Sequence, residues 1–159
     1  MANLKQSKQQ NKKVTVSFAE RTAALTNGPR ASGKASGDEW RLGVWNARGL
    51  NDLKEKELRD TMRVRKIDIL CVPETKKKGR QINKVENGLE LWSGVDQDSH
   101  ASQGIGLIMN ERAKEHVKRY DCVSSRLLWV RMKVGIRRLF IVACYAPVDG
   151  DSKEAKDNF

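Results

Sequence analysis

The sequence predicts a layered α/β protein with a mixed, mostly antiparallel β-sheet. Residues 67–72 (IDILCV) form a continuous apolar run, which is typical of a short strand buried on both faces. Residues 52–66 carry apolar side chains among charged ones at helical spacing. Two segments rich in β-branched and aromatic residues, 126–134 and 138–145, flank Gly135 and predict a hairpin. Strands and helices mixed in this way indicate a layered arrangement.

The remaining elements follow from local patterns along the chain. Around Leu42 and Val44, apolar and polar side chains alternate, which predicts a half-buried strand. Asp52 and Glu55 form a capping arrangement at the start of the helix. After 67–72 the sequence predicts a basic loop at 76–80, a short irregular stretch, strands at 89–95 and 104–109 separated by a loop, a charged and only weakly helical segment at 110–120, the hairpin, and the start of a helix after residue 149.

The first 39 residues differ in composition from the rest and predict a disordered basic tail. Gln, Asn, Lys, Ser and Gly dominate residues 1–39, and the one apolar patch there is short (Val14, Val16 and Phe18). Such a segment buries too little apolar surface to offset the entropy cost of ordering. The folded domain is therefore expected to cover residues 40–159.

The charge balance indicates an anionic partner. The chain has 31 Lys and Arg residues against 20 Asp and Glu, a formal net charge of +11. Because neutralising phosphates releases their condensed counterions, this excess favours nucleic acid as the partner class. The alternative is a basic surface that only keeps the protein soluble. Nothing in the sequence indicates an obligate protein partner.

Cysteine usage and the N-terminus predict an intracellular protein. Cys71, Cys122 and Cys144 are odd in number and widely spaced, so they match neither a zinc site nor a small disulfide framework. Cys71 and Cys144 lie in apolar runs, where a free thiol behaves as a small hydrophobe, and this usage suits a reducing compartment. The N-terminus has no apolar stretch long enough for a signal peptide or a membrane span. We therefore expect a protein that is not secreted and has no membrane partner. For the tail lysines Lys5, Lys8, Lys12 and Lys13 three interpretations stay open: contacts with phosphates, a weak nuclear address, or a solvated segment without a role.

Three polar residues follow the predicted buried strands and are the candidate functional residues. Asn46 comes after WRLGVW, Glu74 after IDILCVP and Tyr145 after LFIVAC. In layered α/β folds, strand ends are where side chains project from a rigid scaffold into a cleft. Each residue also has a structural interpretation: a loop cap for Asn46, a carboxylate at a helix N-terminus for Glu74, and a packed aromatic at the rim for Tyr145.

The local contexts of these residues occur in a specific order. The strings WNARGL, PETK, GIGLIMN and CYAP follow one another from Trp45 to Pro147. This pattern resembles the endonuclease/exonuclease/phosphatase superfamily, which includes apurinic endonucleases and DNase I. Within it, the likeness is greatest to the endonucleases of LINE-type retrotransposons and to craniofacial development protein 2-like proteins. The resemblance covers residues 40–149 and implies the four-layer α/β sandwich of DNase I-like proteins.

The resemblance implies a role for each candidate residue. Glu74 matches the glutamate that binds the catalytic Mg²⁺, for which Mn²⁺ can substitute, because hard divalent cations prefer carboxylate oxygen. Asn46 matches the asparagine that helps to fix this metal and the attacking water. Tyr145 matches the tyrosine whose hydroxyl approaches the scissile phosphate. The implied reaction is metal-dependent phosphodiester hydrolysis in nucleic acid, with DNA as the expected substrate.

The sequence also departs from the family pattern. Complete members carry a later Asp-x-Asn motif and a terminal Ser-Asp-His motif, and residues 1–159 contain neither. His100 and His116 lie in polar or charged surroundings and are predicted to be exposed, and Asp149 and Asp151 come too early in the chain. We therefore expect the N-terminal half of the domain, an incomplete four-layer sandwich that does not cut. The alternative is a non-catalytic, basic nucleic-acid-binding remnant of a retrotransposon-derived protein. A phosphoinositide, sphingolipid or nucleotide substrate is a weaker alternative. The basic charge balance and the lack of a membrane segment argue against the two lipid substrates.

A half-domain is expected to be poorly packed. If part of the β core is absent, apolar side chains on the strands lack part of their packing. The residues expected to be affected are Ile69, Leu107, Ile108, Val130, Phe140 and Val142. The expected result is a chain that is marginally stable or aggregates.

Overall fold

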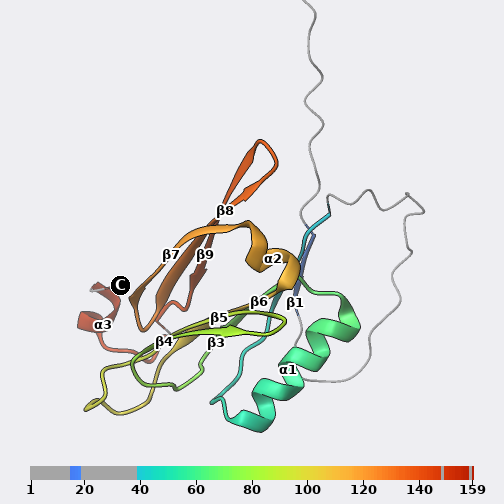
Figure 1. Cartoon of the computed structure of the whole chain (residues 1–159). Coiled ribbons are helices and arrows are strands. Elements are labelled where there is room, and N and C mark those ends of the chain that lie inside the picture. Colours follow the sequence, from blue (N-terminus) through green and yellow to red (C-terminus); the bar gives the residue numbers. More distant parts are fainter. Residues whose placement is uncertain (1–14, 19–38, 148, 158) are drawn as a thin grey trace, which may run out of the picture.

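Two β-sheets and a long helix form three layers in the computed structural model, which describes residues 15–18, 39–147, 149–157 and 159 (Figure 1). Helix α1 lies on one face of the larger sheet, and the smaller sheet lies on the other face. The elements are β1 (Thr15–Phe18), β2 (Arg41–Val44), α1 (Asp52–Arg65), β3 (Ile69–Pro73), β4 (Arg80–Val85), β5 (Gly88–Ser93), β6 (Ile105–Asn110), α2 (Glu111–His116), β7 (Val117–Ser124), β8 (Leu127–Val134), β9 (Arg137–Cys144) and α3 (Lys153–Asp157).

The strand order confirms the predicted fold class. The larger sheet has the order β1-β2-β3-β6-β5-β4, and the smaller sheet has the order β7-β8-β9. Strand β2 pairs in parallel with β1 and β3, whereas the pairs from β3 to β4 and within the smaller sheet are antiparallel. The described chain is thus an α/β protein with a mixed and mostly antiparallel arrangement.

Local chemistry sets the limits of α1. The side chain of Asn51, not Asp52, caps the helix by accepting a hydrogen bond from the backbone N–H of Lys54. The helix ends at Lys66, whose left-handed conformation is usual for a residue that follows a helix. Leu58 and Met62 are buried against the sheet. Leu53, which also fits the helical pattern, is 79% exposed, because the buried face begins one turn later.

Two hydrophobic clusters lie on opposite faces of the larger sheet. One is formed with the smaller sheet and α2, and the other is formed with α1. Four of the positions expected to be poorly packed are buried, namely Ile69, Leu107, Ile108 and Val130. The expectation was wrong for these four because the smaller sheet and α1 already cover them. It holds for Phe140 and Val142, which are 54% and 49% exposed on β9.

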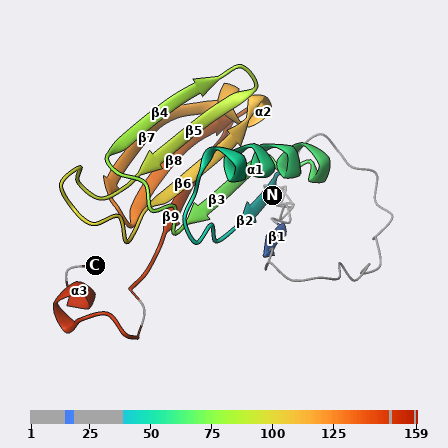
Figure 2. The same cartoon turned by 90° about the horizontal axis from the view of Figure 1, so that it is seen from below.

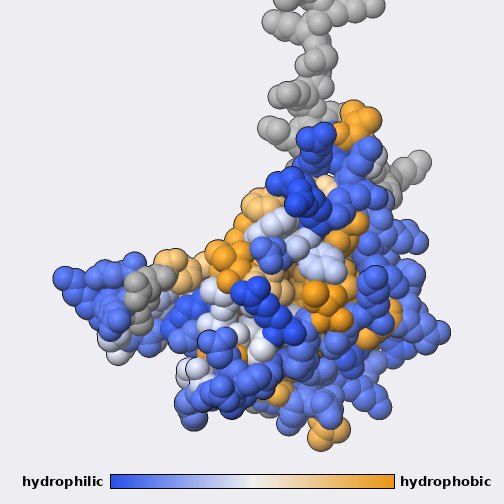
Figure 3. Space-filling view, turned by 60° about the vertical axis from the view of Figure 1, so that its left-hand side comes forward, coloured by the Kyte–Doolittle hydropathy of each residue, from blue (hydrophilic) through white to orange (hydrophobic). Residues whose placement is uncertain are grey.

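Hydropathy shows where the surface departs from this packing. Figure 3 shows hydrophobic residues gathered in the middle of one face, with hydrophilic residues around them. Cys144 is a free thiol exposed at the end of β9, although it lies in an apolar run of the sequence. Burial raises the pKa of the half-buried Cys71 to about 12, with a smaller contribution from Cys144. Cys71 therefore remains a neutral thiol at physiological pH.

Three strands differ from the sequence expectation. Strand β4 is almost entirely exposed and polar, so only its antiparallel pairing with β5 identifies it as a strand. Strand β7 follows α2 directly, and it takes up the second half of the segment predicted to be weakly helical. Strand β1 falls within the predicted tail, and it forms because the edge of β2 offers a parallel partner. The rest of the tail, residues 1–14 and 19–38, lies outside the described part, so the boundary between tail and domain stays a prediction.

Helix α3 stands apart from the two sheets in Figure 2. An ion pair between Arg126 Nη2 and Asp151 Oδ2, 2.9 Å apart, connects the segment before α3 to the start of the smaller sheet. None of the helices that the structure describes is both long and apolar enough to span a membrane.

Candidate active site

The loops that follow β2 and β3 run side by side. The parallel pairing of these strands continues beyond their ends, because the backbone N–H groups of Ala47, Gly49 and Leu50 donate to the carbonyls of Pro73, Glu74 and Thr75 at 2.7–3.0 Å. The two loops are therefore held at a fixed distance. This pairing brings together two of the residues singled out in the sequence, Asn46 and Glu74.

Asn46 and Glu74 are in direct contact. Asn46 Nδ2 donates to Glu74 Oε1 at 2.6 Å, and Asn46 Oδ1 accepts from the backbone N–H of Arg48 at 3.0 Å. These two bonds fix the orientation of the amide. Glu74 itself has φ of 56°, in the left-handed region that non-glycine residues rarely adopt. The contact between the amide and the carboxylate therefore depends on an unusual backbone conformation.

Tyr145 is the third member of the cluster. It follows β9, and its backbone N–H donates to the carbonyl of Arg126 at 2.9 Å. Its side chain lies close enough to Glu74 for the carboxylate to act on the phenol. Burial raises the pKa of Tyr145, the neighbouring Glu74 carboxylate raises it further, and the Arg126 guanidinium opposes them. Tyr145 is therefore a neutral phenol at physiological pH and a hydrogen-bond donor.

The backbone around Glu74 rests on a buried support that the sequence analysis missed. Thr75 is fully buried, and its N–H donates to the carbonyl of Gly104 at 3.0 Å. Lys77 Nζ lies 2.5 Å from Glu55 Oε1 and 4.8 Å from the centre of the Trp92 ring. The sequence signal for this support was Glu55, a carboxylate among the apolar residues on the inner face of α1.

Both histidines lie apart from this cluster's hydrogen bonds. His100 is exposed, as predicted. His116 is half-buried, which corrects the prediction, because its ring lies edge-on to Trp40 and its Nδ1 is 3.0 Å from the carbonyl oxygen of Lys133. Asp151 is engaged by Arg126. Within the described ranges, neither histidine hydrogen-bonds to Asn46 or Glu74.

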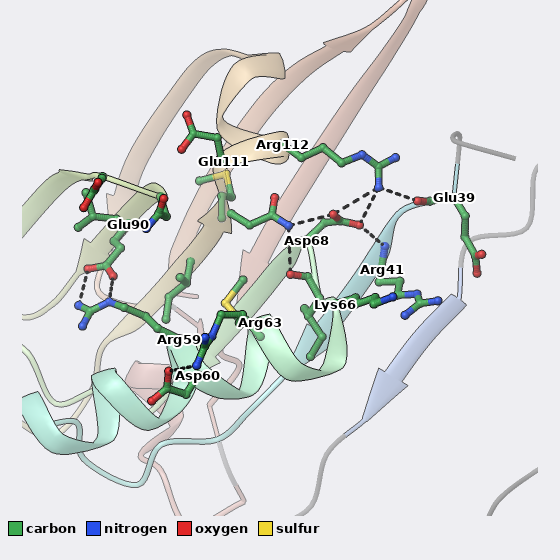
Figure 4. A pocket seen from close by; sticks show the side chains of 18 residues that line it. Glu39, Arg41, Arg59, Asp60, Arg63, Lys66, Asp68, Glu90, Glu111 and Arg112 are labelled. Atoms are coloured by element: carbon green, nitrogen blue, oxygen red, sulfur yellow. Dashed lines mark hydrogen bonds and ion pairs between the residues drawn. The ribbon is translucent and has the colours of Figure 1, made fainter. Parts of the chain in front are cut away.

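A second polar cluster lies at the opposite ends of β2 and β3. It lines a pocket of about 1300 Å³ beside α1, shown in Figure 4. Asp68, just before β3, accepts from the backbone N–H of Arg41 at 2.9 Å and from the Asn110 amide at 3.0 Å, and it pairs with Arg112 at 3.3 Å. Because its partners occupy both oxygens, this carboxylate acts as a structural connection between strands.

The donor chemistry at Glu74 fits a magnesium ion. One carboxylate and the oxygen of an amide are hard ligands, and Mg²⁺ commonly uses one or two carboxylates while keeping several waters. The part of the chain described by the structure contains no group of three or more His, Cys, Asp or Glu side chains placed to hold a metal. The cluster is thus a one-carboxylate site, without the closed ligand set of a structural zinc site.

Comparison with known proteins agrees with this arrangement. The two-sheet fold is similar to that of an AP endonuclease of known structure. Craniofacial development protein 2 of Bos taurus is 25% identical over 126 residues, which are 79% of this chain and 21% of that protein. The crystal structure of the AP endonuclease LMAP from Leishmania major has the same fold, with a TM-score of 0.54 and 18% identity over 70% of this chain.

These two matches support the relationship expected from the motifs, at low sequence identity. No protein-family model matches the chain. The chain spans about a fifth of the curated relative and 41% of the solved endonuclease.

Proposed function

We propose that this chain carries the metal-binding and phosphate-facing part of a site for phosphodiester hydrolysis in nucleic acid, with DNA as the substrate. The observation that carries the proposal is the convergence of three side chains from separate strand ends. Asn46 hydrogen-bonds to the carboxylate of Glu74, and Tyr145 lies near enough for that carboxylate to raise its pKa. A structural cap or a packed rim aromatic would not require the amide and the phenol to meet at one carboxylate.

Glu74 and Asn46 are the proposed ligands of Mg²⁺ or Mn²⁺. A bound divalent cation would supply charge neutralisation for the phosphate oxygens. Asn46 holds one carboxylate oxygen at 2.6 Å and thereby sets the direction of the other. The Asn46 amide carries no charge, so it orients Glu74 and offers its oxygen to the cation without adding to the charge of the site.

Tyr145 is proposed to donate a hydrogen bond to a phosphate oxygen. Its raised pKa keeps the proton on the phenol at physiological pH, so the hydroxyl is available as a donor. The Glu74 carboxylate is near the phenol and contributes to this shift. A substrate phosphate next to Glu74 would lie within reach of the same hydroxyl.

A protein of these 159 residues alone is proposed to bind nucleic acid without cutting it. Activation of water and protonation of the leaving oxygen need a base and an acid. The sequence contains neither an Asp-x-Asn nor a Ser-Asp-His motif to supply them. The net charge of +11 specifically favours this binding role, which is the second candidate function for the chain.

Calorimetric titration with Mn²⁺ and a plasmid-nicking assay test these proposals together. The wild-type chain is expected to bind Mn²⁺, and Glu74→Gln is expected to weaken binding at least about tenfold, since even losing a hydrogen-bond partner of a metal ligand costs about that much. Glu57→Gln makes the same chemical change on the exposed side of α1 and is the matched control. The wild type and Glu74→Gln are both expected to retard DNA in a gel without nicking it.

The outcomes separate the two parts of the proposal. Equal Mn²⁺ affinity in the wild type and Glu74→Gln would rule out the metal site. Mg²⁺-dependent nicking that disappears in Glu74→Gln would contradict the binding-only role and establish hydrolysis. Absence of any DNA retardation would rule out nucleic acid as the partner.

A further inference from the structure

Three consecutive lysines beside Glu74 have different environments. Lys77 is 19% exposed, and its ammonium group contacts Glu55 and the Trp92 ring. Lys78 Nζ donates to the carbonyl of Gln97 at 2.7 Å. The ammonium group of Lys76 has no hydrogen-bond or ion-pair partner among the described residues, and the residue is exposed. The first lysine of this run is thus the one whose charge is not used within the protein.

Arg48 is the counterpart of Lys76 on the neighbouring loop. It is exposed, and its guanidinium has no hydrogen-bond or ion-pair partner in the part of the chain that the structure covers. This is unlike Arg59, which pairs with two glutamates, and Arg126, which pairs with Asp151. Arg48 therefore also presents an unused positive charge beside the candidate active site.

Both residues adopt left-handed backbone conformations. The φ angle is 47° at Arg48 and 54° at Lys76. A non-glycine residue in this region costs about 1–2 kcal/mol, and such residues persist where the surrounding structure holds them, often at functional sites. The hydrogen bonds between the two loops hold them here. Each cation is two residues beyond a member of the Asn46–Glu74 pair.

The Lys76 side chain also lies next to Gly49, the residue that follows Arg48. The Gly49 N–H donates to the carbonyl of Glu74 at 2.7 Å, and its φ is 93°. A β-carbon added at Gly49 would lie 3.5 Å from Lys76 Cδ, so the lysine stem passes over this glycine. Arg48 and Lys76 thus come from adjacent, hydrogen-bonded loops.

We infer that Arg48 and Lys76 form a clamp for two backbone phosphates of a nucleic-acid strand, on either side of the phosphate at Glu74. This inference rests on the proposed function, because it takes the Asn46–Glu74 pair as the reacting centre. A guanidinium binds phosphate through two parallel hydrogen bonds, and an ammonium binds it as a point charge. Their unused charges and constrained backbones suit contacts with phosphates at fixed positions along a strand.

Salt-dependent binding to a short fluorescent DNA duplex tests the clamp with the full chain. Each phosphate contact contributes about 0.9 to the slope of log K against log salt concentration on duplex DNA. Arg48→Gln and Lys76→Gln are each expected to lower the slope by about that amount, and the double variant by about twice as much. Arg48→Lys and Lys76→Arg keep the charge and are expected to keep the slope.

Two controls separate the clamp from general charge and from folding. Arg65→Gln removes an exposed cation from the last turn of α1, at the far ends of the strands, and is expected to leave the slope unchanged. Lys77→Gln is expected to lower the melting temperature while leaving the slope unchanged, because Lys77 is bound internally. Arg48→Asn and Lys76→Asn suit the left-handed backbone and repeat the test if a Gln variant fails to fold.

Slopes for Arg48→Gln and Lys76→Gln that equal that of Arg65→Gln would overturn the clamp while leaving nucleic-acid binding intact. Absence of salt-dependent binding by the wild type would overturn the clamp and the proposed function together. A loss of slope restricted to the two clamp positions would support both.

Discussion

Strand β3, which pairs in parallel with β2, has a carboxylate at each of its two ends, and the two carboxylates differ in their surroundings. Asp68, before β3, is 5% exposed and holds a backbone N–H, an amide and a guanidinium. Glu74, after β3, accepts a hydrogen bond from Asn46 and lies near Tyr145 in a more exposed environment. The first carboxylate has its acceptor sites engaged by the protein, whereas the second keeps oxygen surface for a ligand.

This contrast gives a criterion for reading polar clusters in the chain. A buried carboxylate surrounded by donors stabilises the fold, and removing it leaves those donors unpaired. A carboxylate with a neutral amide, a phenol and two unpaired cations nearby suits the binding of a ligand, as proposed for Glu74. Figure 4 shows charged residues around Asp68, and its dashed lines join this carboxylate to Arg41, Asn110 and Arg112.

The largest expected effect compares alanine at the two ends. Asp68→Ala is expected to destabilise the protein by about 3 kcal/mol, because Arg41, Asn110 and Arg112 lose a shared acceptor. Glu74→Ala is expected to cost about 1 kcal/mol or less, since its partners are accessible to water. Urea denaturation of both variants measures the difference.

A surface control is available for this comparison. Asp60 pairs with Arg63 across one turn of α1, with both side chains more than half exposed, so Asp60→Ala is expected to cost less than about 0.5 kcal/mol. If Glu74→Ala proved as destabilising as Asp68→Ala, Glu74 would have a structural role and the contrast between the two ends would fail.

An intermediate effect is expected at the glycine behind Glu74. A β-carbon at Gly104 would lie 2.2 Å from Thr75 Oγ1, and its φ is 136°. Gly104→Ala is therefore expected to cost about 2 kcal/mol and to disturb the loop that carries Glu74. Gly135→Ala, at a φ of 59° with open space around it, is the control and is expected to cost about 1 kcal/mol. Thermal melts rank the two, and equal costs would show that Thr75 does not require this glycine.

The smallest expected effect is a shift in the titration of Tyr145. The neighbouring Glu74 carboxylate raises the pKa of this phenol, so Glu74→Gln is expected to lower that pKa toward its ordinary value. The chain has two tyrosines, and Tyr145→Phe identifies which titration belongs to Tyr145. The measurement is the ultraviolet absorbance of tyrosinate against pH. An unchanged profile in Glu74→Gln would separate Tyr145 from Glu74 in solution.

The same pKa shift has a consequence for stability in alkali. The pKa of Tyr145 is raised in the folded protein above its ordinary value of 10.0. The unfolded chain therefore loses this proton first, and the stabilisation present below that value declines as pH rises through the folded pKa. Tyr145→Phe is expected to weaken this alkaline loss of stability.

Much of the fold was predictable because its strands and its long helix have strong periodic patterns. The run at 67–72 and the hairpin at 126–145 are dense in apolar and β-branched residues, and both are strands in the structure. Strand β4 was not predictable by the same means, because it is polar and depends on pairing with β5. Strand β7 was missed because its charged start continues the composition of α2.

The candidate site was predictable in its residues but not in its geometry. Asn46, Glu74 and Tyr145 were identified from their positions after strands, and the structure brings their side chains together, while their catalytic and metal-binding roles remain predictions. The sequence could not show that the charges of Arg48 and Lys76 are unpaired, because only the structure shows that Lys77 and Lys78 have partners within the protein. Left-handed backbone at Arg48, Glu74 and Lys76 likewise depends on tertiary hydrogen bonds between the two loops.

Strand β9 has a practical consequence for every measurement above. Among the described strands it pairs only with β8, and Phe140 and Val142 are exposed along it. A strand edge with apolar side chains is a template for another chain, so self-association is expected to rise with protein concentration. Variants therefore need to be compared in dilute solution at one matched concentration. A charged substitution such as Val142→Lys offers a more tractable background for long experiments.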